Sequence, residues 1–134
     1  MPEPTDIPAE VTGYCLCGSC GFAYSGAPRF MAHCHCESCR RATASPFTSY
    51  IGIPDGHWRW TGAAPQDYAS SPGVTRSFCP TCGSQLAYRA ETFPGEIHFF
   101  AALLDDPAHF VPTVHVHSGE IVPWLHLADD LPRK

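Results

Sequence analysis

All eight cysteines of this chain lie in three short stretches, Cys15-Leu-Cys17-Gly-Ser-Cys20, Cys34-His-Cys36-Glu-Ser-Cys39 and Cys79-Pro-Thr-Cys82. Cysteines separated by one or two residues can direct their sulfurs to one metal ion, at about 2.3 Å from zinc. Pairs this close in sequence make strained disulfides. We therefore interpret the three stretches as sets of metal ligands, with zinc as the ion.

Length and composition predict one small domain built from short strands. The chain has 134 residues, a length that suits a single hydrophobic core. Its 14 prolines and 11 glycines divide it into segments too short for long helices. Residues 1–12, which include Pro2, Pro4 and Pro8, are expected to be a disordered tail, and 13–134 to form the zinc domain.

Strand and turn patterns support a mainly β fold of short antiparallel sheets. Aromatic and β-branched residues alternate with polar ones in segments bounded by glycine or proline. A hairpin around Ser71-Pro72-Gly73 is expected to deliver the third cysteine stretch. We expect one helical turn at 40–43, no helix of ten residues or more, and strands at 22–24, 29–33, 47–53, 58–60, 66–70, 74–78, 85–89, 96–101 and 114–117.

Charge and hydropathy argue against nucleic acid and membrane partners. The formal net charge is −5, and thiolate ligands would make the chain more negative. No run of lysines and arginines is present to attract a phosphate backbone or an anionic bilayer. No apolar run approaches the ~20 residues that cross a membrane, and the first residues lack the features of a signal peptide. We expect a cytoplasmic protein, in which thiols stay reduced.

The third stretch predicts half of a closed zinc site. In Cys79-Pro-Thr-Cys82-Gly83 a tight turn directs both sulfurs to one side, and Gly83 permits a positive φ at the exit. Cys15 and Cys17, one residue apart on an extended segment, place both sulfurs on one face. We predict that Cys15, Cys17, Cys79 and Cys82 share one structural zinc ion. Such an ion contributes about 10–16 kcal/mol of apparent binding free energy.

The second stretch predicts a different kind of site. Cys34, Cys36 and Cys39 can bind one ion from a single local segment, which leaves a fourth position open for water or substrate, as in catalytic zinc sites. In the alternative, Cys20 supplies a fourth sulfur and closes the site. Spacing alone gives the two arrangements equal weight. An iron–sulfur cluster is disfavoured, because these spacings match neither of the familiar ferredoxin patterns.

Several other polar residues have both a functional and an ordinary interpretation. Arg40 and Arg41 could bind a substrate carboxylate or offset thiolate charge. His115 and His117 could flank a ligand pocket or belong to a hydrogen-bonded face of a strand. In an extended segment His33 and His35 point away from the metal and suit supporting roles. The aromatic residues Phe47, Tyr50, Trp58 and Trp60 are expected in the core.

The three stretches, in this order, resemble the glutathione-dependent formaldehyde-activating enzyme family, which includes centromere protein V type proteins. The resemblance runs from Gly13 to about Pro132 through CHCESCRRATASPF, RSFCPTCGSQLAYR and FFAALLDDPAHFVPTVHVHSGEIVPWLHLADDLPR. It implies a β-tent fold, a structural ion on Cys15, Cys17, Cys79 and Cys82, a catalytic ion on Cys34, Cys36 and Cys39, and synthesis of S-hydroxymethylglutathione. Cys20 departs from the family pattern, and the chain is shorter than the founding enzyme.

The resemblance and the spacing together predict a zinc-dependent carbon–sulfur lyase with two ions per chain. Its substrate would be a small-molecule thiol or aldehyde, or the adduct of the two. The ion on Cys34, Cys36 and Cys39 would be catalytic, with Arg40 orienting an anionic substrate and His115 as a candidate for proton transfer. The alternative is a noncatalytic zinc-binding module for protein or ligand binding, which a closed second site would favour.

Overall fold

The computed structural model describes residues 10–134, which form two β-sheets and one short helix. Most of the segment expected to be a tail, residues 1–9, lies outside the described residues. Strand β1 begins at Val11, within the last part of that segment. The prediction of a mainly β fold is confirmed, and the helix has seven residues.

The smaller sheet has three antiparallel strands in the order β1-β2-β5. They are β1 (Val11–Tyr14), β2 (Cys20–Tyr24) and β5 (Trp58–Gly62). The first cysteine stretch connects β1 to β2, and the turn after β4 carries the chain from the larger sheet into β5. β4 and β5 are therefore neighbours in sequence but belong to different sheets.

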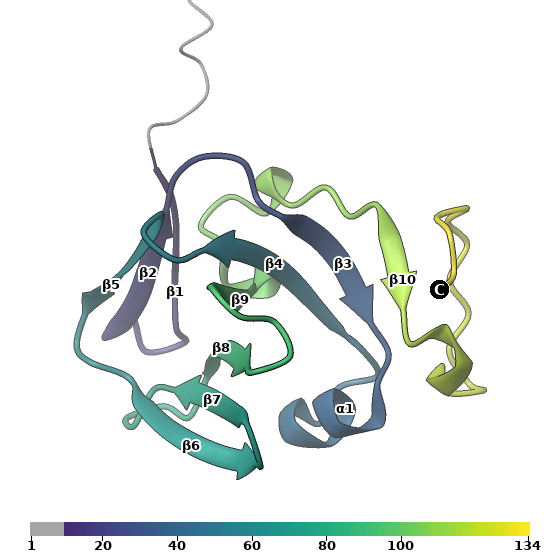
Figure 1. The fold of residues 1–134 in the computed structure, drawn as a ribbon, viewed down its shortest axis with the longest axis horizontal. Helices are drawn as coiled ribbons and strands as arrows, with labels where there is room; N and C mark the ends of the chain where they lie inside the picture. The colour runs from purple at the N-terminus through teal and green to yellow at the C-terminus, as the bar shows by residue number, and fades with distance from the viewer. Residues whose placement is uncertain (1–9) are drawn as a thin grey trace, which may run out of the picture.

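The larger sheet has seven strands in the order β10-β3-β4-β9-β8-β7-β6 (Figure 1). Its strands are β3 (Phe30–Cys34), β4 (Thr48–Pro54), β6 (Gln66–Ser71), β7 (Val74–Phe78), β8 (Gln85–Ala90), β9 (Glu96–Phe100) and β10 (Val114–Val116). The expected hairpin of β6 and β7 is present. One pair differs from the antiparallel expectation, because β10 lies parallel to β3 and makes the sheet mixed. The chain between β3 and β10, which includes α1, strands β4 to β9 and two 3₁₀ turns, is long enough to allow a parallel pair.

The hydrophobic core joins the smaller sheet to one face of the larger one. Phe22 of β2 stacks on Phe99 of β9 with ring centroids 4.1 Å apart, and both side chains are fully buried. Trp58 and Trp60, expected in the core, pack edge-on against Phe99. Alternation along β4 places Ile51 in this core and sends its neighbours to the opposite face. That opposite face is free to carry a site.

Helix α1 (Glu37–Thr43) begins three residues earlier than the expected turn at 40–43. Cys36 is its N-cap, and the sulfur accepts a hydrogen bond from the Cys39 backbone N–H. Glu37 adds a favourable charge to the first turn. The helix ends at Thr43, and its C-cap Ala44 has a left-handed φ of 53°. Short 3₁₀ turns follow later at Ala101–Leu103, Pro107–His109 and Ser118–Glu120.

The last residues of the chain are fixed to the outer strand of the larger sheet. The His115 N–H of β10 donates to the Pro132 carbonyl, and the Lys134 N–H donates to the His115 carbonyl, both at 2.8 Å. The C-terminus therefore lies beside β10 in Figure 1. Within residues 10–134 no helix is long and apolar enough to span a bilayer.

Candidate metal centres and the cavity beside them

Cys15, Cys17, Cys79 and Cys82 come together at one end of the two sheets, with all four sulfurs within 4.8 Å of one another. The Sγ atoms of Cys15 and Cys17 are 3.6 Å apart, and those of Cys17 and Cys79 are 3.8 Å apart. Four sulfurs arranged tetrahedrally at zinc–sulfur distances of about 2.3 Å are spaced about 3.8 Å apart. The donor set therefore fits a tetrahedral zinc ion.

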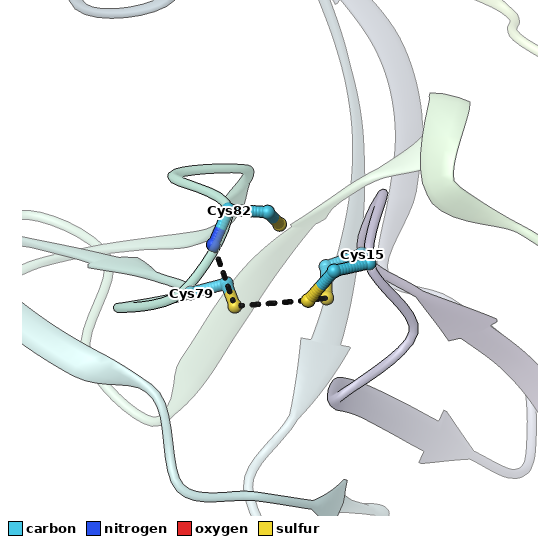
Figure 2. Close-up of side chains that lie close together, drawn as sticks. Cys15, Cys79 and Cys82 are labelled. Carbon is cyan, nitrogen blue, oxygen red and sulfur yellow. Dashed lines mark hydrogen bonds between the residues drawn. The ribbon is translucent and has the colours of Figure 1, made fainter.

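A tight turn after β7 places the sulfurs of Cys79 and Cys82. After β7, the Gly83 N–H donates to the Cys79 carbonyl at 2.8 Å, and Gly83 has a φ of 80°. The Cys82 N–H points at the Cys79 sulfur, as Figure 2 shows. The nitrogen and sulfur atoms are 3.5 Å apart. Hydrogen bonds from the Ser19 hydroxyl and from the Cys82 backbone lower the pKa of the Cys79 thiol to about 5. These donors favour the thiolate that a metal requires.

Cys20 is buried beside this first cluster and belongs to neither ligand group. Its side chain packs with Cys15, Cys79 and Leu86. Burial raises the pKa of the Cys20 thiol to about 11, which favours the protonated form. The arrangement in which Cys20 closes the second cluster is therefore wrong, because β2 places this thiol at the four-cysteine cluster instead.

Cys34, Cys36 and Cys39 form the second cluster, and their three sulfurs also lie within 4.8 Å of one another. Cys34 ends β3, Cys36 caps α1 and Cys39 lies in its first turn. Within residues 10–134, no fourth cysteine, histidine or carboxylate joins this set. The two clusters, of four and three cysteines, are consistent with two zinc sites per chain.

Two polar side chains of the larger sheet face the Cys39 sulfur. The Tyr50 hydroxyl donates to it at 3.3 Å, and the Arg76 Nη2 atom lies 4.0 Å away. Arg76 is buried, and its guanidinium stacks over the Tyr88 ring at 5.1 Å. A buried cation beside three sulfurs offsets their negative charge. Sequence reasoning placed Tyr50 in the core and missed Arg76, whose partner lies 37 residues away in the chain.

A cavity of about 310 Å³ opens from the three-cysteine cluster across the free face of the larger sheet. Alternation puts Ala32 and Cys34 of β3 on this face, next to Val114 and Val116 of the parallel strand β10. Across β4, a Cβ at Gly52 would lie 2.8 Å from the Phe30 ring, so glycine lets that ring lie flat over the sheet. The complete lining is Phe30, Ala32, Cys34, Cys36, Cys39, Tyr50, Tyr88, Phe93, His98, Val114, Val116 and His117.

His98 is the buried histidine of this cavity, and sequence reasoning missed it. Its Nε2 atom lies 2.6 Å from a carboxylate oxygen of Glu96, which also pairs with Arg29 at 2.8 Å. Burial lowers the pKa of His98 and favours the neutral ring. In the predicted strand 96–101, Glu96 and His98 are two residues apart and separated by an apolar residue. This alternation indicates that both side chains lie on the same face of the sheet.

His115 lies on the other side of β10 from the cavity and is fully buried. Its Nδ1 atom is 2.8 Å from Nε2 of His35, and its Nε2 atom is 3.0 Å from Asp129. Arg133 pairs with the same carboxylate at 2.7 Å. The C-terminal segment is thereby connected to His35, the residue between Cys34 and Cys36 of the second cluster. His117, in contrast, is half exposed and lines the cavity.

Arg40 and Arg41 line a separate hollow with Trp124 instead of the cavity. Arg41 pairs with Glu37 at 2.8 Å on the exposed face of α1. The Nε atom of Arg40 is buried without a partner among the described residues. The structure therefore does not bring Arg40 into contact with the same space as the three cysteines.

The two cysteine clusters and their order in the chain agree with a known family model. The model of the glutathione-dependent formaldehyde-activating enzyme matches residues 10–120, which is most of the chain. The chain belongs to this family. The formaldehyde-activating family includes S-hydroxymethylglutathione synthase, a carbon–sulfur lyase.

A solved structure supports the fold of this family member. It is the crystal structure of a Rhodobacter sphaeroides protein, 18% identical in sequence, with a TM-score of 0.62. The match covers 92% of this chain and 99% of that chain. This similarity shows a shared fold. No curated protein matches the chain at a significant level.

Proposed function

We propose that this family member is a zinc-dependent carbon–sulfur lyase that joins or separates a thiol and a small aldehyde. The observation that supports the proposal best is the position of Cys34, Cys36 and Cys39, which both cluster for one ion and line a cavity. A purely structural site needs no cavity at its ligands. The reversible reaction is R–SH + HCHO ⇌ R–S–CH2OH.

The bond changes define what the cavity must supply. In the joining direction the thiol sulfur adds to the carbonyl carbon, the C=O π bond breaks, and the oxygen receives the proton that the thiol has lost. Zinc held by the three cysteines would supply Lewis acidity and affinity for thiolate sulfur. The protein must hold the thiol and the aldehyde side by side and move one proton between them.

His98 is the residue that we propose for this proton transfer. The Nε2–H of His98 donates a hydrogen bond to the Glu96 carboxylate, so the neutral ring keeps a lone pair on Nδ1. A neutral histidine can take the thiol proton and later deliver it to the alkoxide oxygen. Glu96 suits a fixed orientation of the ring, because it is itself held by Arg29.

Other residues serve this site indirectly in the proposal. Arg76 and Tyr50 stabilise negative charge on the Cys39 sulfur through the contacts described above. His115 orients His35 through their hydrogen bond and is a positioning residue here. We further propose a cytoplasmic location, because both clusters need reduced thiols and all eight cysteines are unpaired.

Exchange NMR tests the proposed activity. Formaldehyde is mixed with a series of thiols, and exchange between free aldehyde and adduct is measured with and without the zinc-loaded protein. We expect acceleration by the wild-type chain and a loss of about 10²-fold or more in His98→Gln. The matched variant His109→Gln changes a histidine outside the cavity and should keep its rate. No acceleration of any thiol by the wild type would contradict the lyase and favour a noncatalytic zinc-binding module.

A further inference from the structure

The cavity walls identify the chemistry of the group that the site can hold. Apart from the cysteines, His98 and His117, the wall consists of aromatic rings and aliphatic side chains, among them Phe30, Ala32, Val114 and Val116. No lysine, arginine, aspartate or glutamate lines it within residues 10–134. A charged group placed there loses hydration without gaining an ion pair.

Buried charges near the cavity are already used by the protein. Glu96 is held by Arg29 and His98, and the guanidinium of Arg76 lies over Tyr88 and faces Cys39. Arg40 and Arg41, the arginines considered as substrate contacts in the sequence, line a different hollow. Among residues 10–134, the carboxylates of glutathione would therefore find no lysine or arginine along the wall of this cavity, and its ammonium group no aspartate or glutamate.

The volume of the cavity also argues against glutathione as the bound thiol. The cavity measures about 310 Å³, part of which the ion and the reacting sulfur would fill. An apolar cavity of about 150 Å³ is enough to hold one benzene ring. One aromatic ring or a branched alkyl group thus fills the remaining space, whereas a tripeptide would extend beyond it.

We propose that the thiol substrate of this chain carries an uncharged aromatic or branched alkyl group, which packs against Phe30, Val116 and Phe93. This inference rests on the proposed function, which it makes more specific. The sulfur lies at the cysteine end and the apolar group extends along the sheet. Phe93 is 46% exposed and contacts the His98 ring at 5.0 Å between centroids, so it forms an accessible part of the rim.

Binding is measured apart from activity. The zinc-loaded full chain is titrated with benzyl mercaptan, with benzyl alcohol and with glutathione, and the methyl resonances of Ala32, Val114 and Val116 are followed by NMR. Benzyl mercaptan should bind at least about tenfold more tightly than glutathione. Benzyl alcohol, which lacks sulfur, should shift the same methyl resonances. Equal or tighter binding of glutathione, or no shift of these resonances with either benzyl compound, overturns the inference.

Substitution of Phe93, at the rim of the cavity, tests the inference and has a matched control. Phe93→Arg removes an apolar contact and adds a cation, so it should weaken benzyl mercaptan binding several-fold and strengthen glutathione binding. Val111→Arg adds the same charge at an exposed position outside the cavity and should change neither affinity. If Phe93→Arg leaves both affinities unchanged, the assigned wall is wrong.

Exchange NMR separates this inference from the lyase proposal. If benzyl mercaptan binds in the cavity but no thiol exchanges faster, the lyase proposal fails and the apolar binding preference stands. If glutathione exchanges faster than benzyl mercaptan, the lyase proposal stands and the substrate class is wrong. If benzyl mercaptan is the better substrate, both are supported.

Discussion

The two cysteine clusters use the same ligand chemistry in opposite surroundings. Cys15 and Cys17 meet Cys79 and Cys82 across more than sixty residues, so the first cluster joins distant parts of the chain. The second cluster spans only residues 34–39 and faces a cavity. A complete set of four sulfurs connecting two segments suits a structural role, and three sulfurs beside a cavity suit chemistry. The predictions below test this difference.

Cys79→Ser should have the largest effect, the loss of the folded state. This substitution removes a ligand from the ion that joins the first stretch to the third, and structural zinc energies of about 10–16 kcal/mol match or exceed the net stability of a domain. Circular dichroism and zinc content measure the outcome. A variant that keeps the native spectrum and melts cooperatively near the wild-type temperature would contradict a structural role for this cluster.

Cys36→Ser should remove one zinc equivalent and the proposed lyase activity while the fold persists. Serine is itself a favoured N-cap, so α1 retains its first hydrogen bond. Elemental analysis, thermal melting and the exchange assay are made on the same preparation. Loss of the fold comparable to that of Cys79→Ser would remove the distinction between the two clusters.

Asp129→Ala should lower the melting temperature by a few degrees. The substitution leaves the fully buried His115 without its carboxylate partner, and His35 loses its indirect connection to the C-terminal segment. Asp130→Ala is the matched control, since Asp130 is exposed in the same segment. The exchange rate should fall as well if His35 orientation matters to the second cluster. Equal melting temperatures for the two variants would show that this chain of hydrogen bonds contributes nothing measurable.

Cys20→Ser should have the smallest effect, about 1 kcal/mol of lost stability from placing a hydroxyl in a buried apolar position. Both zinc equivalents should remain, because Cys20 belongs to neither ligand group. Zinc content and chemical denaturation measure the two quantities. Loss of one equivalent would show that this thiol is a ligand after all.

Local patterns predicted much of this molecule, and contacts distant in sequence account for what they missed. Alternation was enough for nine of the ten strands, and spacing for the grouping of Cys15, Cys17, Cys79 and Cys82. Alternation missed β1 (Val11–Tyr14), which begins in the segment expected to be a tail, and spacing left the place of Cys20 open. The parallel pairing of β10 with β3 depends on a connection of about eighty residues, which carries no local pattern. The approach of Arg76 to Cys39 and of His98 to the cavity depends on sheet order in the same way. The predicted helical turn at 40–43 begins three residues after the start of α1, because the prediction did not consider Cys36 as an N-cap.

The most direct test of the difference between the clusters is stepwise zinc removal from the wild-type chain. EDTA is added in increments while released zinc and the circular dichroism spectrum are recorded together. We predict two equivalents per chain, the first released with the native spectrum intact and the second only as the protein unfolds. Release of both equivalents in one unfolding step, or complete removal of zinc without any change in the spectrum, would contradict this account.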